Sequence, residues 1–189
     1  MNLLRALVIR SALVFAAAAL RLAPASAPLG AAETKAAPAA VRIKAGITQP
    51  LTDETGRVWQ PDQGFYDGET IERPGIGISR TSTPSLYRAE RYSMTKFTYV
   101  VPNGRYIVKL HFAETYEGIN GPGQRVFSYT VEGKAFKDFD IFKTTGGLNR
   151  AYVETVEVEI KDGQLDLTFT PNIENPQINA LEILPAPVT

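Results

Sequence analysis

Apolar and polar residues alternate with a period of two along several segments of the chain. In residues 105–112 Tyr106, Val108, Leu110 and Phe112 fall on one face, and Ile107 is the one apolar residue on the other. Successive side chains of a β-strand point to opposite faces of a sheet. The pattern therefore predicts a strand over 105–112 that buries this face. The opposite face carries mostly polar residues, among them Lys109 and the single histidine, His111.

A second alternating region extends from Val156 to Phe169. Its first half buries Val156, Val158 and Ile160, and its second half buries Leu165, Leu167 and Phe169. The dipeptide Asp162-Gly163 separates the halves and has the signature of a tight turn. We therefore expect a β-hairpin here.

Further turn signals divide the rest of the chain into short strands. Asn103-Gly104 and Glu132-Gly133 are two of them, and the segment NALEIL at 179–184 closes the series. No ten-residue stretch after the N-terminal region has a helical apolar stripe. The pattern predicts an all-β fold, an antiparallel β-sandwich of jelly-roll type.

The N-terminal residues have the pattern of a secretory signal peptide. Residues 1–27 combine Arg5 and Arg10, an apolar block and the small residues around Ala25 and Ala27. Pro28 makes cleavage after Ala27 awkward, so Ala25 and the region near Ala32 are alternative sites. An uncleaved anchor is the other interpretation, but the block is short for a membrane span.

Length and composition place one folded unit after this segment. Residues 28–40 are small and dotted with proline, which predicts a flexible lead-in. The domain is expected over 41–184, with 185–189 as a tail. The chain has 189 residues with 44% hydrophobic composition, enough for one core.

Charge and cysteine content exclude several classes of function. Lys and Arg total 20, as do Asp and Glu. Removal of residues 1–27 leaves the chain with a net charge of about −3. Neither nucleic acid nor an anionic membrane is therefore an expected partner. The absence of cysteine excludes disulfides, thiolate zinc sites and a cysteine nucleophile. We expect a secreted or periplasmic protein with no membrane span in its mature chain.

The sequence contains little that points to catalysis. His111 shares a strand face with Lys109, and the ordinary interpretation is an exposed strand residue. No nucleophile elbow, zinc-protease motif or Walker loop occurs. We therefore expect a protein that is not an enzyme and has no cofactor.

Loop carboxylates leave glycoside hydrolysis open as an alternative, because two carboxylates suffice for that chemistry. Glu114 and Glu117 follow the strand at 105–112, and Glu174 lies in the loop PNIENPQ. Such residues are more often simply solvated. Asp138 and Asp140 alternate with apolar neighbours, which indicates a strand rather than a calcium loop. No metal site is expected.

Tyrosines near turns are the stronger chemical signal. They are Tyr66, Tyr87, Tyr92 and Tyr116. A sugar ring has an apolar C–H face and a periphery of hydroxyl groups, so its sites combine flat aromatic rings with polar groups. The alternative for each tyrosine is a half-buried ring with a solvated hydroxyl.

A resemblance to a known family follows from an ordered set of motifs. They are VRIKAG, TDETGRVWQPDQGFYDG, LYRAERY, YIVKLHFAETYEG, GQRVFSYTVEGKAFKDFDIF, VEVEIKDGQLDLTFTP and ENPQINALEIL. Their order over 41–184 resembles that of malectin-like domains. The resemblance implies a β-sandwich of malectin or galactose-binding-like type that binds carbohydrate and is not an enzyme.

Matching the family's motifs residue by residue gives a candidate binding site. Tyr92 ends ERY, Tyr116 follows FAE and one further residue, and Glu174 precedes NP. Glu117 stands where the family often has a second aromatic residue, and is included as a hydroxyl acceptor. Tyr66 is matched to an early-loop tyrosine. Lys44 stands where an asparagine is common.

The expected function is that of a secreted, non-catalytic carbohydrate-binding module. The resemblance implies a glucose-containing ligand such as an α-glucan-like oligosaccharide. The alternative is a structural or protein-interaction β-sandwich that has lost the sugar site, because Glu117 replaces an aromatic residue.

Overall fold

Alternating apolar faces assemble into two antiparallel sheets in the computed structural model, which describes residues 38–187. The four-stranded sheet has the order β1 (Val41–Lys44), β14 (Ala180–Pro185), β8 (Gly104–Phe112) and β11 (Tyr152–Ile160). The five-stranded sheet has the order β10 (Lys134–Phe139), β9 (Val126–Val131), β12 (Gln164–Ile173), β7 (Lys96–Val100) and β4 (Phe65–Tyr66).

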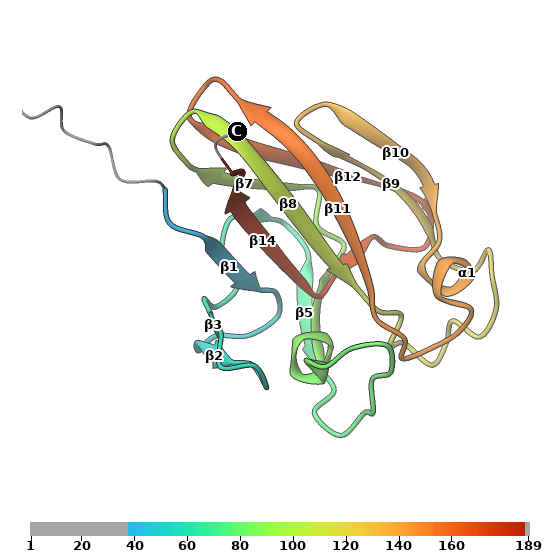
Figure 1. The fold of residues 1–189 in the computed structure, drawn as a ribbon. Helices are drawn as coiled ribbons and strands as arrows, with labels where there is room; N and C mark the ends of the chain where they lie inside the picture. The colour runs from blue at the N-terminus through green and yellow to red at the C-terminus, as the bar shows by residue number, and fades with distance from the viewer. Residues whose placement is uncertain (1–37, 188–189) are drawn as a thin grey trace, which may run out of the picture. The chain divides into compact units, whose positions relative to one another are not determined.

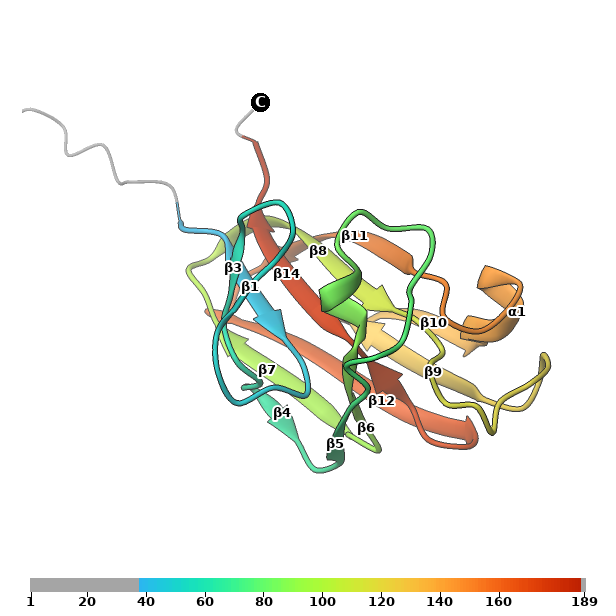
Figure 2. The same cartoon turned by 90° about the horizontal axis from the view of Figure 1, so that it is seen from below.

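Smaller elements cover the end and one outer face of this sandwich. A third sheet has the order β13 (Gln177–Ile178), β6 (Ala89–Tyr92) and β5 (Glu69–Glu72). A hairpin joins β2 (Leu51–Thr52) to β3 (Val58–Trp59), and a 3₁₀ helix, η1, spans Pro84–Tyr87. Figure 2 views the molecule from below, and β5 and β6 lie in the foreground, across the end of the sandwich that faces the viewer.

The main core lies between the two large sheets, as the alternation predicts. Tyr106, Val108, Leu110 and Phe112 of β8 are at most 2% exposed. The predicted faces of β11 and β12 are buried too, so their inward positions are confirmed. Burial of each large apolar side chain contributes roughly 1.5–3 kcal/mol before the cost of chain entropy.

The turn at Asp162-Gly163 does not form the predicted hairpin. β11 pairs only with β8 among the described strands, whereas β12 pairs with β7 and β9 in the opposite sheet. The turn therefore carries the chain from one sheet to the other. The turn at Glu132-Gly133 does form a hairpin, between β9 and β10. The chain thus passes between the two large sheets, and together they form the β-sandwich expected from the sequence.

His111 is buried, so the prediction of an exposed residue is wrong. The hairpin β2–β3 and helix η1 fold onto the outer face of β8 and build a second core around Trp59 and Tyr87. The Trp59 ring meets the imidazole edge-on, with ring centroids 5.5 Å apart. Nδ1 of His111 lies 3.0 Å from the Tyr87 hydroxyl, and Nε2 lies 3.2 Å from Glu182. Tyr87 is therefore a core residue rather than a loop ligand.

The segment around Asp138 and Asp140 is strand only in its first part. β10 ends at Phe139, and a short helix, α1 (Ile141–Thr145), follows it. Asp140 is the N-cap of α1 and accepts a hydrogen bond from the Lys143 backbone N–H. The predicted continuous strand is thus wrong beyond Phe139, because the aspartate carboxylate satisfies a free N–H at the helix start.

The signal peptide predicted for 1–27 and most of the lead-in predicted for 28–40 lie outside the described residues, as does the end of the tail. Within residues 38–187, none of the helices has the length and apolar character needed to cross a membrane. Lys44 of β1 is buried, and its ammonium group donates hydrogen bonds to the carbonyls of Ala45, Ala89 and Asn179. This lysine joins β1, β6 and the start of β14.

Candidate functional site

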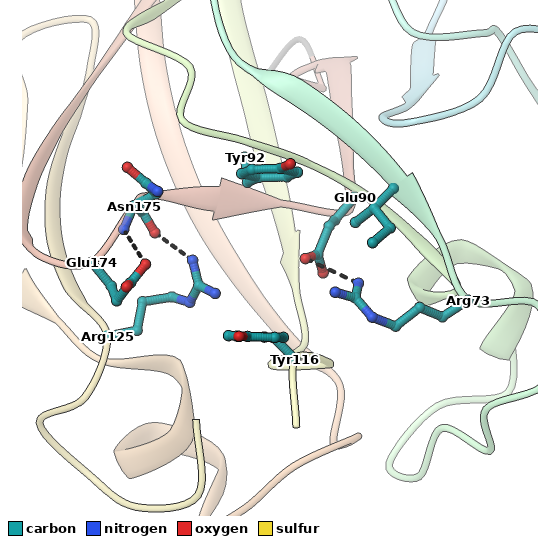
Figure 3. Close-up of a pocket in the computed structure, with 8 residues that line it drawn as sticks. Arg73, Glu90, Tyr92, Tyr116, Arg125, Glu174 and Asn175 are labelled. Carbon is teal, nitrogen blue, oxygen red and sulfur yellow. Dashed lines mark hydrogen bonds and ion pairs between the residues drawn. The ribbon is translucent and has the colours of Figure 1, made fainter. Parts of the chain in front are cut away.

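Two tyrosine rings face each other across a cleft of about 190 Å³ at the end of the sandwich. We call it the tyrosine cleft. Tyr92 comes from β6 and Tyr116 from the loop that follows β8, and Figure 3 shows both rings nearly edge-on at opposite sides. The other lining residues are Ile71, Arg73, Glu90, Arg125, Glu174 and Asn175. Segments far apart in the sequence thus build one concave surface.

Strand β6 forms one side of the cleft, because its alternate side chains point to the same face of the strand. Glu90 and Tyr92 point to the same face of the strand, and their cross-strand partners on β5 are Ile71 and Glu69. The Tyr92 hydroxyl donates to Glu69 at 2.6 Å. This hydrogen bond to a carboxylate raises the pKa of Tyr92. The Tyr92 ring is therefore tethered at its outer end, with its face toward the cleft.

Tyr116 forms the opposite side and is 48% exposed. Its backbone N–H donates to the Glu114 carboxylate at 3.1 Å, and its carbonyl accepts from the N–H of Ile119 at 2.9 Å. A Cβ atom on Gly118 would lie only 2.5 Å from the ring. The turn around Tyr116 is thus ordered, and Gly118 leaves the space that the ring needs.

A buried ion pair joins the Tyr116 loop to the opposite loop. Nε of Arg125 donates to Glu114 at 2.7 Å, and its Nη1 donates to the carbonyl of Asn175 at 2.5 Å. Glu114 is fully buried, which contradicts the interpretation of a solvated loop carboxylate. Burial raises the pKa of Glu114, and the Arg125 guanidinium opposes part of that rise. The pair fixes Arg125 between the two loops.

A second ion pair lies across the cleft. Arg73 follows β5, and its Nη1 is 3.1 Å from the Glu90 carboxylate and 3.0 Å from the Thr115 hydroxyl. Thr115 in turn donates to Glu90 at 2.7 Å. Each arginine therefore brings guanidinium donors to the cleft together with a carboxylate that balances its charge. Such a surface offers donors and acceptors without a strong net field.

Glu174 and Asn175 complete the cleft from the loop after β12. Glu174 has a backbone φ of 59°, an uncommon conformation for a residue with a side chain. Its Oε2 accepts a hydrogen bond from the Asn175 backbone N–H at 3.3 Å. The exposed carboxylate is free to accept further hydrogen bonds from a ligand.

The structure brings three of the five predicted binding residues together. Tyr92, Tyr116 and Glu174 all line the tyrosine cleft. Glu117 is exposed beside Tyr116 but does not line it. Tyr66 lies on β4, is 53% exposed and accepts a hydrogen bond from the Thr98 hydroxyl at 3.4 Å. It does not line the cleft either.

Five lining residues were not predicted. Glu90 had a usable signal, because it stands two positions before Tyr92 in a short strand and so shares its face. Asn175 also had one, because it directly follows Glu174 in the same loop. Ile71, Arg73 and Arg125 had none. Their roles depend on contacts between segments that the sequence pattern does not pair.

The part of the chain that the structure describes contains no candidate metal-binding cluster. No group of three or more His, Asp or Glu side chains there is arranged to hold a metal ion. Of the three carboxylates considered for hydrolysis, Glu114 is engaged by Arg125 and Glu117 lies off the cleft. The cleft is suited to reversible binding by ring contacts and hydrogen bonds.

Comparison with known families decides the classification. The malectin domain matches residues 39–181 of the chain. The chain belongs to the malectin domain family. This malectin domain includes every residue of the tyrosine cleft, and its family is one of carbohydrate-binding-like domains.

Curated relatives of this malectin domain are much longer proteins. Receptor-like protein 4 of Arabidopsis thaliana is 37% identical over 134 residues, covering 70% of this chain and 20% of that protein. The receptor-like protein kinase FERONIA of the same plant is 29% identical over 140 residues, which cover 67% of this chain and 15% of that protein. The chain thus spans a fifth or less of these relatives.

Solved structures share the fold of this malectin domain. The ANXUR2 extracellular domain from Arabidopsis thaliana has a TM-score of 0.69 at 20% identity, covering 79% of this chain and 49% of that chain. A β-glucuronidase from Bacteroides uniformis has a TM-score of 0.71 at 16% identity, and the match covers 79% of this chain and 18% of that chain. The predicted antiparallel sandwich is confirmed.

Proposed function

We propose that this malectin domain is a non-catalytic module that binds one pyranose ring of a glucose-containing oligosaccharide in the tyrosine cleft. The observation that carries the proposal is the placement of Tyr92 and Tyr116 on opposite sides of a cleft of about 190 Å³. Two aromatic faces can contact both apolar faces of a sugar ring. The chain that bears the module is proposed to act outside the cytoplasm, as the N-terminal pattern predicts.

Polar groups around the rings match the hydroxyl groups of a sugar. Arg73 and Arg125 supply donors, while Glu174 and the Asn175 side chain supply acceptors. Each hydrogen bond replaces one to water, so its net contribution is about 1 kcal/mol. A single module is then expected to bind with a Kd of roughly micromolar to millimolar.

The test is a titration of the domain with maltose, nigerose, cellobiose and galactobiose, followed by calorimetry or amide chemical shifts. We expect saturable binding of at least one glucose disaccharide. Tyr92→Ala and Tyr116→Ala should each weaken it by roughly 5- to 30-fold, because each removes an aromatic face worth about 1–2 kcal/mol.

Tyr66→Ala is the matched control, since Tyr66 is as exposed as Tyr116 but lies outside the cleft. It should leave the Kd unchanged. Absence of saturable binding to the whole panel would contradict the proposal and favour a structural or protein-interaction domain. Release of reducing sugar from a polysaccharide would contradict the non-catalytic part alone.

A further inference from the structure

A second and larger cleft, of about 490 Å³, lies between the edge strands of the two sheets. We call it the edge cleft. It is bounded by β10 and β11, and α1 lies at one end of both strands (Figure 1). At the other end, the Lys134 ammonium group donates to the carbonyl of Glu157. The volume falls within the range of small-ligand sites, roughly 300–1,000 Å³.

A β-bulge builds the aromatic base of the edge cleft. Phe136 pairs with Tyr129, and Phe139 pairs with Phe127, so three steps along β10 oppose two along β9. Asp138 takes a φ of 53° to make the bulge. In a regular strand, residues three apart point to opposite faces. The bulge instead directs both phenylalanines to the same side, beside Tyr129.

These rings leave flat surface available to a ligand. Tyr129 stacks on Phe136 with centroids 4.7 Å apart and an interplanar angle of 8°. Phe139 stands nearly perpendicular to Tyr129, at 5.6 Å and 83°. Phe136 and Phe139 are only partly buried, although they pack against the main core. An apolar ring face can therefore rest on them.

The Tyr129 hydroxyl is the second observation that points to a ligand. Tyr129 is 2% exposed, and its hydroxyl has no hydrogen-bond partner among residues 38–187. Native proteins rarely leave a buried hydroxyl unpaired, because its lost hydration is not replaced. Burial and the nearby charge of Glu154, which also lines the edge cleft, raise the pKa of Tyr129. The hydroxyl stays protonated and can donate.

Charges around the edge cleft are mixed rather than of one sign. Lys137 and Lys143 are the cations, and Asp138, Asp140 and Glu154 are the anions. One oxygen of Glu154 is held by the Tyr152 hydroxyl at 2.6 Å, which orients the carboxylate. Near-cancellation gives little preference for an ionic ligand. The lining favours a neutral molecule with one apolar face and several hydroxyl groups.

We propose that the edge cleft is a second, separate sugar-binding site that takes one neutral pyranose ring. Its C–H face packs on Phe136 and Phe139. Its hydroxyl groups accept from Tyr129 and the lysine ammonium groups, and donate to Glu154. This proposal does not depend on binding in the tyrosine cleft, since the two sites share no residue.

The experiment follows backbone amide shifts of the labelled domain during titration with methyl α-glucoside, methyl β-galactoside and N-acetylglucosamine. The Tyr92→Ala/Tyr116→Ala variant is titrated as well, which removes the first site. In both proteins we expect saturable shifts around Phe136, Lys143 and Glu154 at sugar concentrations of up to about 50 mM, above a low-millimolar Kd. Sorbitol, an acyclic polyol without a flat face, should not produce them.

Two small substitutions test the assigned contacts. Tyr129→Phe removes only the unpaired hydroxyl, so it should weaken binding at least fivefold while leaving the melting temperature unchanged or higher. Glu154→Gln should weaken binding similarly, whereas Glu157→Gln, on the same strand but outside the edge cleft, should not.

The proposal is overturned if none of the three sugars gives saturable shifts at the edge cleft. It is also overturned if Tyr129→Phe and Glu154→Gln leave those shifts unchanged. A lower melting temperature for Tyr129→Phe would show that the hydroxyl serves the fold and would remove the main argument. Shifts at the edge cleft without shifts at Tyr92 and Tyr116 would support this site while contradicting the function proposed for the first.

Discussion

Gly118 determines where the Tyr116 ring can lie. A Cβ atom at this position would approach the ring to 2.5 Å, and the phenolic carbon and hydroxyl to less than 3 Å. We therefore predict that Gly118→Ala displaces the ring from the tyrosine cleft and weakens disaccharide binding by about tenfold, the loss of one aromatic contact. Calorimetric titration measures the change.

Gly121→Ala is the control for this prediction. Gly121 lies in the same loop, but a Cβ atom there would meet only the Gln124 side chain, at 3.8 Å or more. The Kd of this variant should match that of the wild type. Equal Kd values for Gly118→Ala and Gly121→Ala would show that the ring position does not control affinity.

Single residues of the site differ in how well the sequence predicts them. Tyr92, Tyr116 and Glu174 follow from motif order, and all three line the cleft. Arg73 and Arg125 do not, because their partners Glu90 and Glu114 become neighbours only in the folded chain. Burial of Glu114 was missed for the same reason.

The short hairpin β2–β3 depends on one carboxylate. Asp53 accepts hydrogen bonds from the Thr55 hydroxyl, the Trp59 indole N–H and the backbone N–H groups of Thr55 and Arg57. Desolvation opposes ionisation, but these hydrogen bonds outweigh it and lower the pKa of Asp53 to about 2 from 3.8. The hairpin thus holds Trp59 over the outer face of β8.

We predict that Asp53→Asn lowers the free energy of unfolding at neutral pH by about 1–3 kcal/mol, since it weakens bonds to buried donors. A lowered folded-state pKa stabilises the protein above the unfolded pKa, and this contribution is lost as pH falls toward 2. The difference between wild type and Asp53→Asn should therefore narrow between pH 4 and 2. Urea unfolding at a series of pH values measures it, and a constant difference would contradict the assigned role.

Turns were predicted more reliably than the partners of the strands that they connect. Glu132-Gly133 and Asp162-Gly163 have similar local signals, yet the first closes a hairpin and the second joins opposite sheets. A turn signal reports that the chain changes direction. Which strand lies alongside depends on packing of distant segments, such as β12 between β7 and β9. The burial of His111 under η1 has the same origin.

The two large sheets are also joined through the tyrosine cleft. Glu114 follows β8 of one sheet, whereas Arg125 precedes β9 and Asn175 follows β12 of the other. We predict that Glu114→Gln lowers the free energy of unfolding by about 3–5 kcal/mol, because it leaves the Arg125 cation buried without its counter-charge. Disaccharide affinity should fall as well, because Arg125 and the Tyr116 turn lose a shared support. Chemical denaturation and calorimetry measure the two effects.

The double variant Glu114→Gln/Arg125→Met tests whether the loss of stability comes from the unpaired charge of Arg125. Removal of both charges leaves no uncompensated ion, so stability should recover relative to Glu114→Gln alone. Affinity should not recover, because the guanidinium donors are gone. A double variant as unstable as the single one would indicate that the ion pair is not the reason for the loss.

Strand β1 lies beside β14, with Val41 opposite Ile183, and β14 in turn aligns Pro185 with Tyr106 near the beginning of β8. Val41 lies level with Val108 and Pro185 with Tyr106, whereas Tyr116 follows the far end of β8. Four to six residue steps of strand, roughly 13–20 Å, therefore separate the two flanking segments from that end. Fusion or surface attachment through either flank therefore leaves the end that carries the tyrosine cleft unobstructed. A module with this polarity can be carried by a longer polypeptide, or fixed to a sensor chip by either terminus, while still presenting its tyrosines outward.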